Sequence, residues 1–290
     1  SHRLGWFYDF LRFGNDILIM TSIHDWLQAS PLPKLEARML LQYVGGFSRA
    51  YLVAHDDEVL PDMMVWQLND MQQARIDGVP MAYLLGEREF YGRVFQVTPD
   101  VLIPRPETEL LVETVLQYLP QGGSVWDIGT GSGIIAITTA LERSDARVHA
   151  SDISAAALDI ARNNTGRLGA QVQFHHGSWY DVTPAITAKV AVLVSNPPYI
   201  HKDDAHLSQG DLRFEPQQAL TDFDDGLNAY RALAAGCAHC VQAQGWLMVE
   251  HGFEQAADIQ AIFQAAGLQN VHTLQDYAGL DRITLGQLSA

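Results

Sequence analysis

The chain has 290 residues, with 34 acidic and 18 basic side chains and a formal net charge of -16. This length allows two domains and a large buried core. The strong negative charge argues against a nucleic-acid-binding protein, because such proteins carry positive surfaces that neutralise phosphates. With only two cysteines and no recognisable signal peptide, we expect a reducing, cytoplasmic compartment.

The first third of the chain predicts a small helical domain. Residues 1–19 form an extension of unknown role, which is too short and too interrupted by charge to span a membrane. From residue 20 to 80, apolar side chains recur at helical spacing, as they do over 35–44 and 63–68. Residues 81–103 then predict a hairpin-like linker with Gly92 near its turn.

The remaining residues, 104–290, alternate strands and helices, which predicts an α/β fold with a doubly wound, mainly parallel sheet. Its first expected strand, 125–128, runs directly into the turn Gly129, Thr130, Gly131, Ser132 and Gly133, and a helix is expected over 134–141. Glycines permit a positive φ and a close backbone approach, and a helix start offers unpaired N–H groups. The spacing fits neither the dinucleotide fingerprint nor the phosphate loop, so the turn by itself names no ligand.

Asp152 and Trp179, which follow the next two expected strands, point to a nucleoside ligand. Asp152 ends the expected strand 146–151, where a carboxylate can accept both hydroxyls of a ribose. The competing interpretation is a cap for the helix expected over 154–162. Trp179 follows the strand 172–174 and is placed to stack on an adenine, although a core tryptophan with a bonded indole N–H is the commoner case.

The tetrapeptide Asn196-Pro197-Pro198-Tyr199 suggests the reaction. It follows the apolar run 190–195, which predicts a strand buried on both faces that the two prolines end. The side-chain carbonyl of Asn196 and the backbone carbonyl of Pro197 can accept both hydrogens of an -NH2 group, and Tyr199 offers a flat surface. The plainer alternative is a proline turn with a buried tyrosine.

In this order and spacing, Asp127 to Gly133, Asp152, Trp179 and the Asn196 corner resemble the class I methyltransferases that use S-adenosylmethionine to modify amino nitrogens. Four further segments resemble the bacterial release factor glutamine methyltransferases more narrowly. They are 102–109, with Ile-Pro-Arg-Pro-Glu-Thr, and 209–216, 250–252 and 276–283. The resemblance runs from about Ile23 to the end of the chain.

The resemblance implies roles for individual residues. The turn from Gly129 to Gly133 would pass under the methionine part of S-adenosylmethionine, Asp152 would hold the ribose, and Trp179 would flank the adenine. Asn196 would lie between cofactor and acceptor, with the corner that ends at Tyr199 binding a glutamine side-chain amide. The acceptor would be the glutamine of the Gly-Gly-Gln tripeptide in peptide chain release factors, and the product N5-methylglutamine.

Other functions share parts of this pattern. Adenine-N6 DNA methyltransferases also hold an -NH2 group at such a corner, but no Lys/Arg-rich insertion accompanies it here. A glutamine methyltransferase of a ribosomal protein, or a non-catalytic cofactor-binding interaction module, would keep the cofactor residues. We expect a monomer that contacts neither nucleic acid nor membrane.

Three further features receive a structural interpretation. Cys237 and Cys240 lie in a helix expected over 228–242 and have no second cysteine pair, so we expect plain thiols and no metal. The acidic cluster 222–226 is expected to be a solvated turn. Arg105, between two prolines, either pairs with a carboxylate such as Glu215 or lines the substrate cleft.

Overall fold

The computed structural model describes residues 21–186 and 188–289 and divides the chain between Leu84 and Leu85 into two compact units. The two units are described separately. The extension expected over residues 1–19 lies outside the described residues.

The first unit is helical, as the periodicity predicts. Its helices are α1 (Ile23–Ala29), α2 (Lys34–Gly45), α3 (Arg49–Ala54) and α4 (Asp62–Ile76), and α5 (Met81–Leu85) follows at the boundary. A capping box starts α1, because Ser22 Oγ accepts the Asp25 N–H at 3.1 Å and the Asp25 carboxylate accepts the Ser22 N–H. Fully buried Leu40, Leu41 and Leu68 form the interior of the unit together with Ile23.

The second unit is built on a seven-stranded sheet in the order β5-β4-β3-β6-β7-β9-β8. The five strands from β5 to β7 run parallel, and β9 is antiparallel to both of its neighbours, so the predicted mainly parallel sheet is confirmed. The strands are β3 (Ser124–Ile128), β4 (Arg147–Asp152), β5 (Gln173–His176), β6 (Val190–Ser195), β7 (Val241–Glu250), β8 (Gln269–Gln275) and β9 (Asp281–Gln287).

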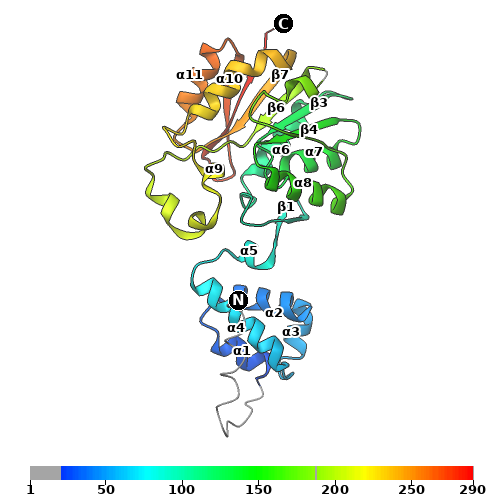
Figure 1. Cartoon of the computed structure of the whole chain (residues 1–290), viewed down its shortest axis with the longest axis vertical. Coiled ribbons are helices and arrows are strands. Elements are labelled where there is room, and N and C mark those ends of the chain that lie inside the picture. Colours follow the sequence, from blue (N-terminus) through cyan, green and yellow to red (C-terminus); the bar gives the residue numbers. More distant parts are fainter. Residues whose placement is uncertain (1–20, 187, 290) are drawn as a thin grey trace, which may run out of the picture. The chain divides into compact units, whose positions relative to one another are not determined.

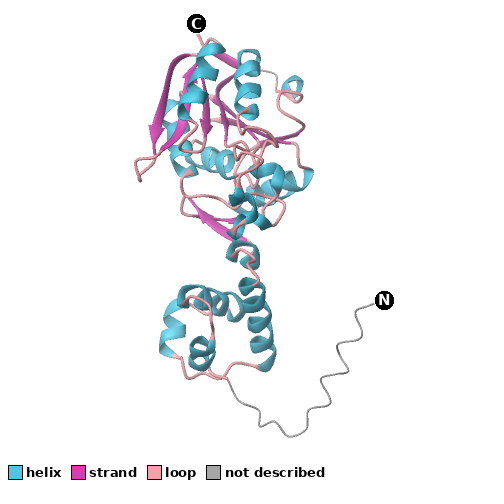
Figure 2. Ribbon diagram, turned by 90° about the vertical axis from the view of Figure 1, so that its left-hand side faces the viewer, coloured by secondary structure: helices cyan, strands magenta, loops and turns pink. Residues whose placement is uncertain are grey.

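Helices cover both faces of this sheet, which makes it doubly wound as expected (Figures 1 and 2). One face carries α6 (Thr108–Tyr118), α7 (Ile134–Glu142) and α8 (Ala155–Leu168), and the other carries α10 (Asn228–Cys240) and α11 (Ala256–Ala265). Short helical turns occupy the connections. They are η2 (Thr183–Ala185), η3 (Ala205–Ser208), η4 (Gly210–Phe214) and α9 (Gln217–Leu220).

A separate hairpin precedes the sheet. Its strands β1 (Glu87–Phe90) and β2 (Arg93–Gln96) pair antiparallel. Tyr91 and Gly92 form the two-residue turn with φ angles of 52° and 68°, and this left-handed pair matches the right-handed twist of a hairpin. The hairpin predicted around Gly92 is therefore present, whereas residues 81–85 of the expected linker form a helix.

Buried Asn164 on α8 connects this hairpin to the glycine turn. Its Oδ1 accepts the Gln96 N–H at 2.7 Å, and its Nδ2 donates to the carbonyls of Gln96 at 3.0 Å and Ser132 at 2.9 Å. Asn164 is completely buried, so no water can replace it. One amide thus fixes the turn in relation to two other elements.

A second buried polar group lies at the end of β3. The Asp127 side chain is fully buried, its Oδ2 accepts the Thr130 hydroxyl at 2.6 Å, and its Oδ1 has no hydrogen-bond partner among the described residues. Burial raises the pKa of Asp127 to about 7, because a charged carboxylate loses its solvation there. Asp127, two residues before the glycine turn, is therefore a carboxyl group that titrates near neutral pH.

Replacing Asn164 should destabilise the second unit. In Asn164→Ala, the backbone groups of Gln96 and Ser132 lose their partners inside the protein, which costs about 2–4 kcal/mol of unfolding free energy. Urea unfolding measures this loss. The exposed neighbour provides the control: Asn163→Ala should change stability by less than about 0.5 kcal/mol. Equal effects of the two substitutions would contradict the role given to Asn164.

Asp127 should make stability fall as pH rises. Its pKa is about 7 in the folded protein and near 3.8 when unfolded, so between these values only the folded state holds the proton. Asp127→Asn removes this penalty. Relative to the wild type, the variant should therefore gain about 2–4 kcal/mol between pH 4 and pH 8. Denaturant unfolding of both proteins at the two pH values tests this, and a constant difference would contradict it.

Candidate active site

A cavity of about 610 Å³ lies at the carboxyl edge of the parallel strands. Open α/β sheets bind ligands at this edge. Most of the residues singled out in the sequence line it, from four separate segments of the chain. They are Gly129, Thr130, Gly131, Ser132, Asp152, Trp179, Asn196 and Pro198. Gly133, Pro197 and Tyr199 are not among the lining residues. The roles expected for all of these site residues stay predictions.

The glycines of the turn have two different structural uses. Gly129 and Gly131 have φ angles of 75° and 55°, and a Cβ added to either would meet no atom within 4 Å. Their backbone therefore leaves open space beside the cavity. A Cβ on Gly133 would lie 2.7 Å from Ile137 Cδ1 and 3.2 Å from the Ala161 Cβ. Gly133 thus allows α7 and α8 to pack closely.

Asp152 joins the glycine turn to the start of α8. Its Oδ2 accepts the Gly131 N–H at 2.9 Å and its Oδ1 accepts the Ser154 N–H at 2.8 Å. The N-cap of α8 is Ser154, whose hydroxyl accepts the Ala157 N–H. Burial raises the pKa of Asp152, and each of its oxygens retains acceptor capacity for a ribose hydroxyl.

Trp179 lies between the core and the cavity, the two locations that the sequence interpretations gave it. It is half-buried, packs against the core beneath α10 and also lines the cavity. Its φ of 44° is unusual for a bulky residue and sets the direction in which the indole leaves the chain. A planar ligand could therefore contact a ring that is already held by the core.

Asn196 combines a held donor with an unused acceptor. It follows β6, in which all six residues are buried, and its Nδ2 donates to Thr108 Oγ1 at 3.3 Å. Its Oδ1 is buried and has no partner among the described residues. Buried acceptors are normally satisfied, so an unused one at a cavity wall indicates a position for a ligand N–H group.

The rest of the corner is structurally fixed. Pro197 is buried, and the Tyr199 carbonyl accepts Gln255 Nε2 at 3.0 Å while the Tyr199 ring packs against the core. Burial raises the pKa of Tyr199 to about 12, so the phenol is neutral at physiological pH. Tyr199 is therefore a rigid support for the corner and no proton acceptor.

Two buried side chains behind Asn196 were missed as site residues in the sequence. Thr108 begins α6 and lines the cavity, and Glu250 ends β7. Both are almost completely inaccessible to solvent. Their positions depend on packing between distant segments, and the only signal was that each belongs to a segment carrying the family resemblance.

Arg105 and Glu215 form the ion pair that the sequence suggested. The Glu215 carboxylate is buried, accepts the Ile103 N–H at 3.0 Å and pairs with the Arg105 guanidinium. Arg105 also lines the cavity, so its contact with the substrate stays a prediction. The pair ties the segment before α6 to the one before α9, and both contribute to the cavity wall.

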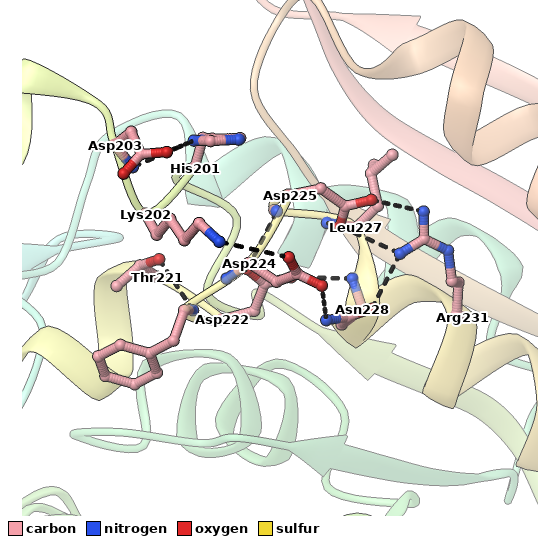
Figure 3. A network of polar contacts seen from close by, with 12 residues as sticks. His201, Lys202, Asp203, Thr221, Asp222, Asp224, Asp225, Leu227, Asn228 and Arg231 are labelled. Atoms are coloured by element: carbon pink, nitrogen blue, oxygen red, sulfur yellow. Dashed lines mark hydrogen bonds and ion pairs between the residues drawn. The ribbon is translucent and has the colours of Figure 1, made fainter.

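The acidic turn forms another part of this wall (Figure 3). Asp222 accepts the backbone N–H groups of Asp224, Gly226 and Asn228 at 2.8–3.0 Å, and Asp225 pairs with Arg231. These hydrogen bonds within the segment hold residues 222–226 as a turn. They present Phe223, which has a φ of 60° and is 61% exposed although it lines the cavity.

The remaining motifs add no site. Cys237 and Cys240 are free, buried thiols on α10, in agreement with the expectation of plain cysteines. Within residues 21–186 and 188–289, no group of three or more His, Cys, Asp or Glu side chains is arranged to hold a metal ion. No helix in that part of the chain is long and apolar enough to cross a bilayer.

Two sequence families match the chain. The methyltransferase small domain matches residues 106–213, which include the glycine turn and Asn196, and the PrmC N-terminal domain matches residues 21–86. Among solved structures, a methyltransferase from Pyrococcus furiosus superposes with a TM-score of 0.54 at 16% identity, covering 76% of this chain and 98% of the other. This similarity supports the fold.

Closer relatives cover nearly the whole chain. The release factor glutamine methyltransferase of Neisseria gonorrhoeae is 54% identical, with 91% of this chain and 96% of the relative aligned. The one from Bordetella pertussis is 49% identical over 93% of this chain and its own full length. These matches confirm the resemblance seen in the motifs, together with its S-adenosylmethionine cofactor. The chain belongs to the release factor glutamine methyltransferase family.

Proposed function

We propose that this protein transfers the methyl group of S-adenosylmethionine to the side-chain amide nitrogen (N5) of the glutamine in the Gly-Gly-Gln tripeptide of peptide chain release factors. The observation that carries the proposal is the unused, buried Oδ1 of Asn196 on the same cavity as the glycine turn and Asp152. Family membership supports the choice of glutamine and of release factors.

The cavity suits the cofactor in its space, its hydrogen-bond acceptors and its aromatic surface. Open space beside Gly129 and Gly131 admits a ligand against the backbone, and Asp152 retains acceptors for the ribose. Thr130 and Ser132 complete the turn, and Trp179 offers its ring to the adenine. When bound there, S-adenosylmethionine supplies an electrophilic methyl group on a sulfonium.

The protein's main task is to position a weak nucleophile. An amide nitrogen has a lone pair delocalised into its carbonyl, so it reacts only when it is held in line with the methyl group, at about 3 Å. In our proposal the oxygens of Asn196 and Pro197 accept the two amide hydrogens, and Pro198 and Tyr199 hold that corner rigid. These bonds strengthen as positive charge grows on nitrogen, which favours the transition state.

A strong base is unnecessary before transfer. The nitrogen becomes acidic only after it has been alkylated, when its surplus proton leaves readily. Tyr199, the only titratable side chain of the tetrapeptide, is a neutral phenol because burial raises its pKa to about 12. We infer that geometry and the two acceptors supply most of the catalysis.

The helical unit would serve substrate recognition. We assign this role to the domain predicted over residues 20–80, joined by the linker 81–103 to the catalytic domain 104–290. The match of residues 21–86 to the PrmC N-terminal domain supports a separate module. We also propose a cytoplasmic monomer whose direct partner is a protein.

A labelling assay tests the acceptor. The protein is incubated with methyl-labelled S-adenosylmethionine and, separately, with unmodified release factor, ribosomal proteins or unmethylated DNA. We expect label on the release factor alone. A release factor in which the tripeptide glutamine is replaced by glutamate should take up none. Label on DNA or on ribosomal proteins would identify one of the alternative enzymes, and no label anywhere would favour a non-catalytic module.

Two substitutions should separate cofactor binding from transfer. Asn196→Ala removes the proposed amide acceptor and should lower the transfer rate by about 100- to 1000-fold. The same variant should keep its affinity for S-adenosylmethionine within about threefold. Asp152→Ala removes the proposed ribose acceptor and should weaken cofactor binding by about 10- to 100-fold. Calorimetry and single-turnover assays measure the two effects. Equal losses of binding in both variants would contradict the separate roles.

A further inference from the structure

Glu250 is a buried acid directly behind the acceptor corner. It ends β7, next to β6 in the sheet, where Ser195 is paired with Val249. The side chains of Thr108 and Asn196 lie close enough to its carboxyl group to lower its pKa as hydrogen-bond donors, while its Oε2 has no partner among the described residues. The Glu250 backbone carbonyl accepts the Tyr230 hydroxyl at 2.9 Å. Glu250 is 1% exposed and is not among the residues that line the cavity.

These contacts decide which way the Asn196 amide points. Its Nδ2 lies on the side of Thr108 and Glu250, where donors are needed, and its Oδ1 is left without a partner. In the flipped orientation, the Asn196 oxygen would meet the Glu250 carboxylate, and two acceptors would repel each other. An ionised Glu250 therefore selects the orientation that leaves the Asn196 oxygen free.

We propose that Glu250 is a positioning residue, which as a carboxylate fixes the Asn196 side chain with its oxygen available to the substrate amide. This role rests on the proposed transfer to glutamine and extends it by one residue. The negative charge behind the Asn196 amide also polarises its carbonyl, so the oxygen becomes a better acceptor as positive charge grows on the substrate nitrogen.

The protonation state of Glu250 should then control the orientation of the Asn196 side-chain amide and, through it, the rate of methyl transfer. Burial raises the pKa of Glu250 to about 7, while Thr108, Arg282 on β9 and Asn196 lower it and Glu107 before α6 raises it. A protonated Glu250 can donate to the Asn196 oxygen and loses its preference for one orientation. The rate of transfer should therefore rise with pH through this range.

The groups packed around Glu250 should not mask this titration, and the comparison with Glu250→Gln separates it from that of Asp127, whose pKa burial also raises to about 7. Burial raises the pKa of Tyr199 to about 12, and Tyr230 on α10 also titrates far above neutrality. His251, the next residue along the chain, has a pKa lowered by burial. The Arg282 guanidinium is paired with Asp276 at 3.2 Å.

The test compares Glu250→Gln with the wild type. Glutamine keeps the shape but can present either an oxygen or an -NH2 group to Asn196. We expect transfer to the release factor to slow by about 10- to 100-fold, with unchanged affinity for S-adenosylmethionine and no rise in rate around pH 7. Glu254→Gln, at an exposed position four residues on, should keep the wild-type rate and pH profile.

A second measurement uses the protein without cofactor or substrate. In the wild type labelled with 15N-asparagine, the side-chain amide signal of Asn196 should titrate near pH 7 together with the 13C carboxyl signal of Glu250. This titration should be absent from Glu250→Gln. A wild-type profile in Glu250→Gln, or an Asn196 signal that does not titrate, would overturn the positioning role. Failure of the wild type to methylate release factors at any pH would instead overturn the proposed function.

Discussion

The parallel register of β3, β4 and β6 is the constraint on which the site depends. In this register Ile128 lies beside Ser151, and Asp127 lies beside Val194. The Ser195 hydroxyl also donates to the Ile128 carbonyl at 2.7 Å, in the buried interior. Three loops that are far apart in the chain must therefore leave the sheet at the same edge. A slip of one residue would turn the side chains of a strand to its opposite face and separate the loops.

Two buried carboxyl groups lie at this same edge, and each costs stability. Asp127 and Glu250 end up in a low-dielectric interior that raises the pKa of both to about 7. Apolar side chains would pack there at less cost. Each carboxyl group lies behind a loop that faces the cavity, Asp127 behind the glycine turn and Glu250 behind Asn196. Both carboxyl groups thus add fixed polar geometry behind the site at a cost in stability.

The sequence predicted those strands and turns whose conformation depends on neighbouring residues in the chain. The apolar run 190–195 forms a completely buried strand, and the glycine turn and Asp152 lie where periodicity and turn chemistry placed them. The antiparallel strand β9 was not predicted, because its pairing with β7 joins distant segments. Thr108 and Glu250 were missed as site residues for the same reason: both lie in segments that carry the family resemblance, but their positions behind Asn196 depend on packing between distant segments. At Gly133 the motif was recognised, but the sequence could not tell packing from ligand binding, because both can require glycine at such a turn.

The choice of acceptor cannot come from the Asn196 corner alone. Two oxygens that hold an -NH2 group suit an adenine as well as a glutamine amide, so the cavity wall must discriminate between them. Its acidic turn carries three aspartates, Asp222, Asp224 and Asp225 (Figure 3). Within the described part of the chain, Lys202 pairs with Asp224 and Arg231 with Asp225. On another part of the wall, Glu215 already neutralises Arg105. A polynucleotide backbone, with one negative charge per phosphate, would be repelled by the aspartates of this wall. The charge of the wall thus favours a protein amide.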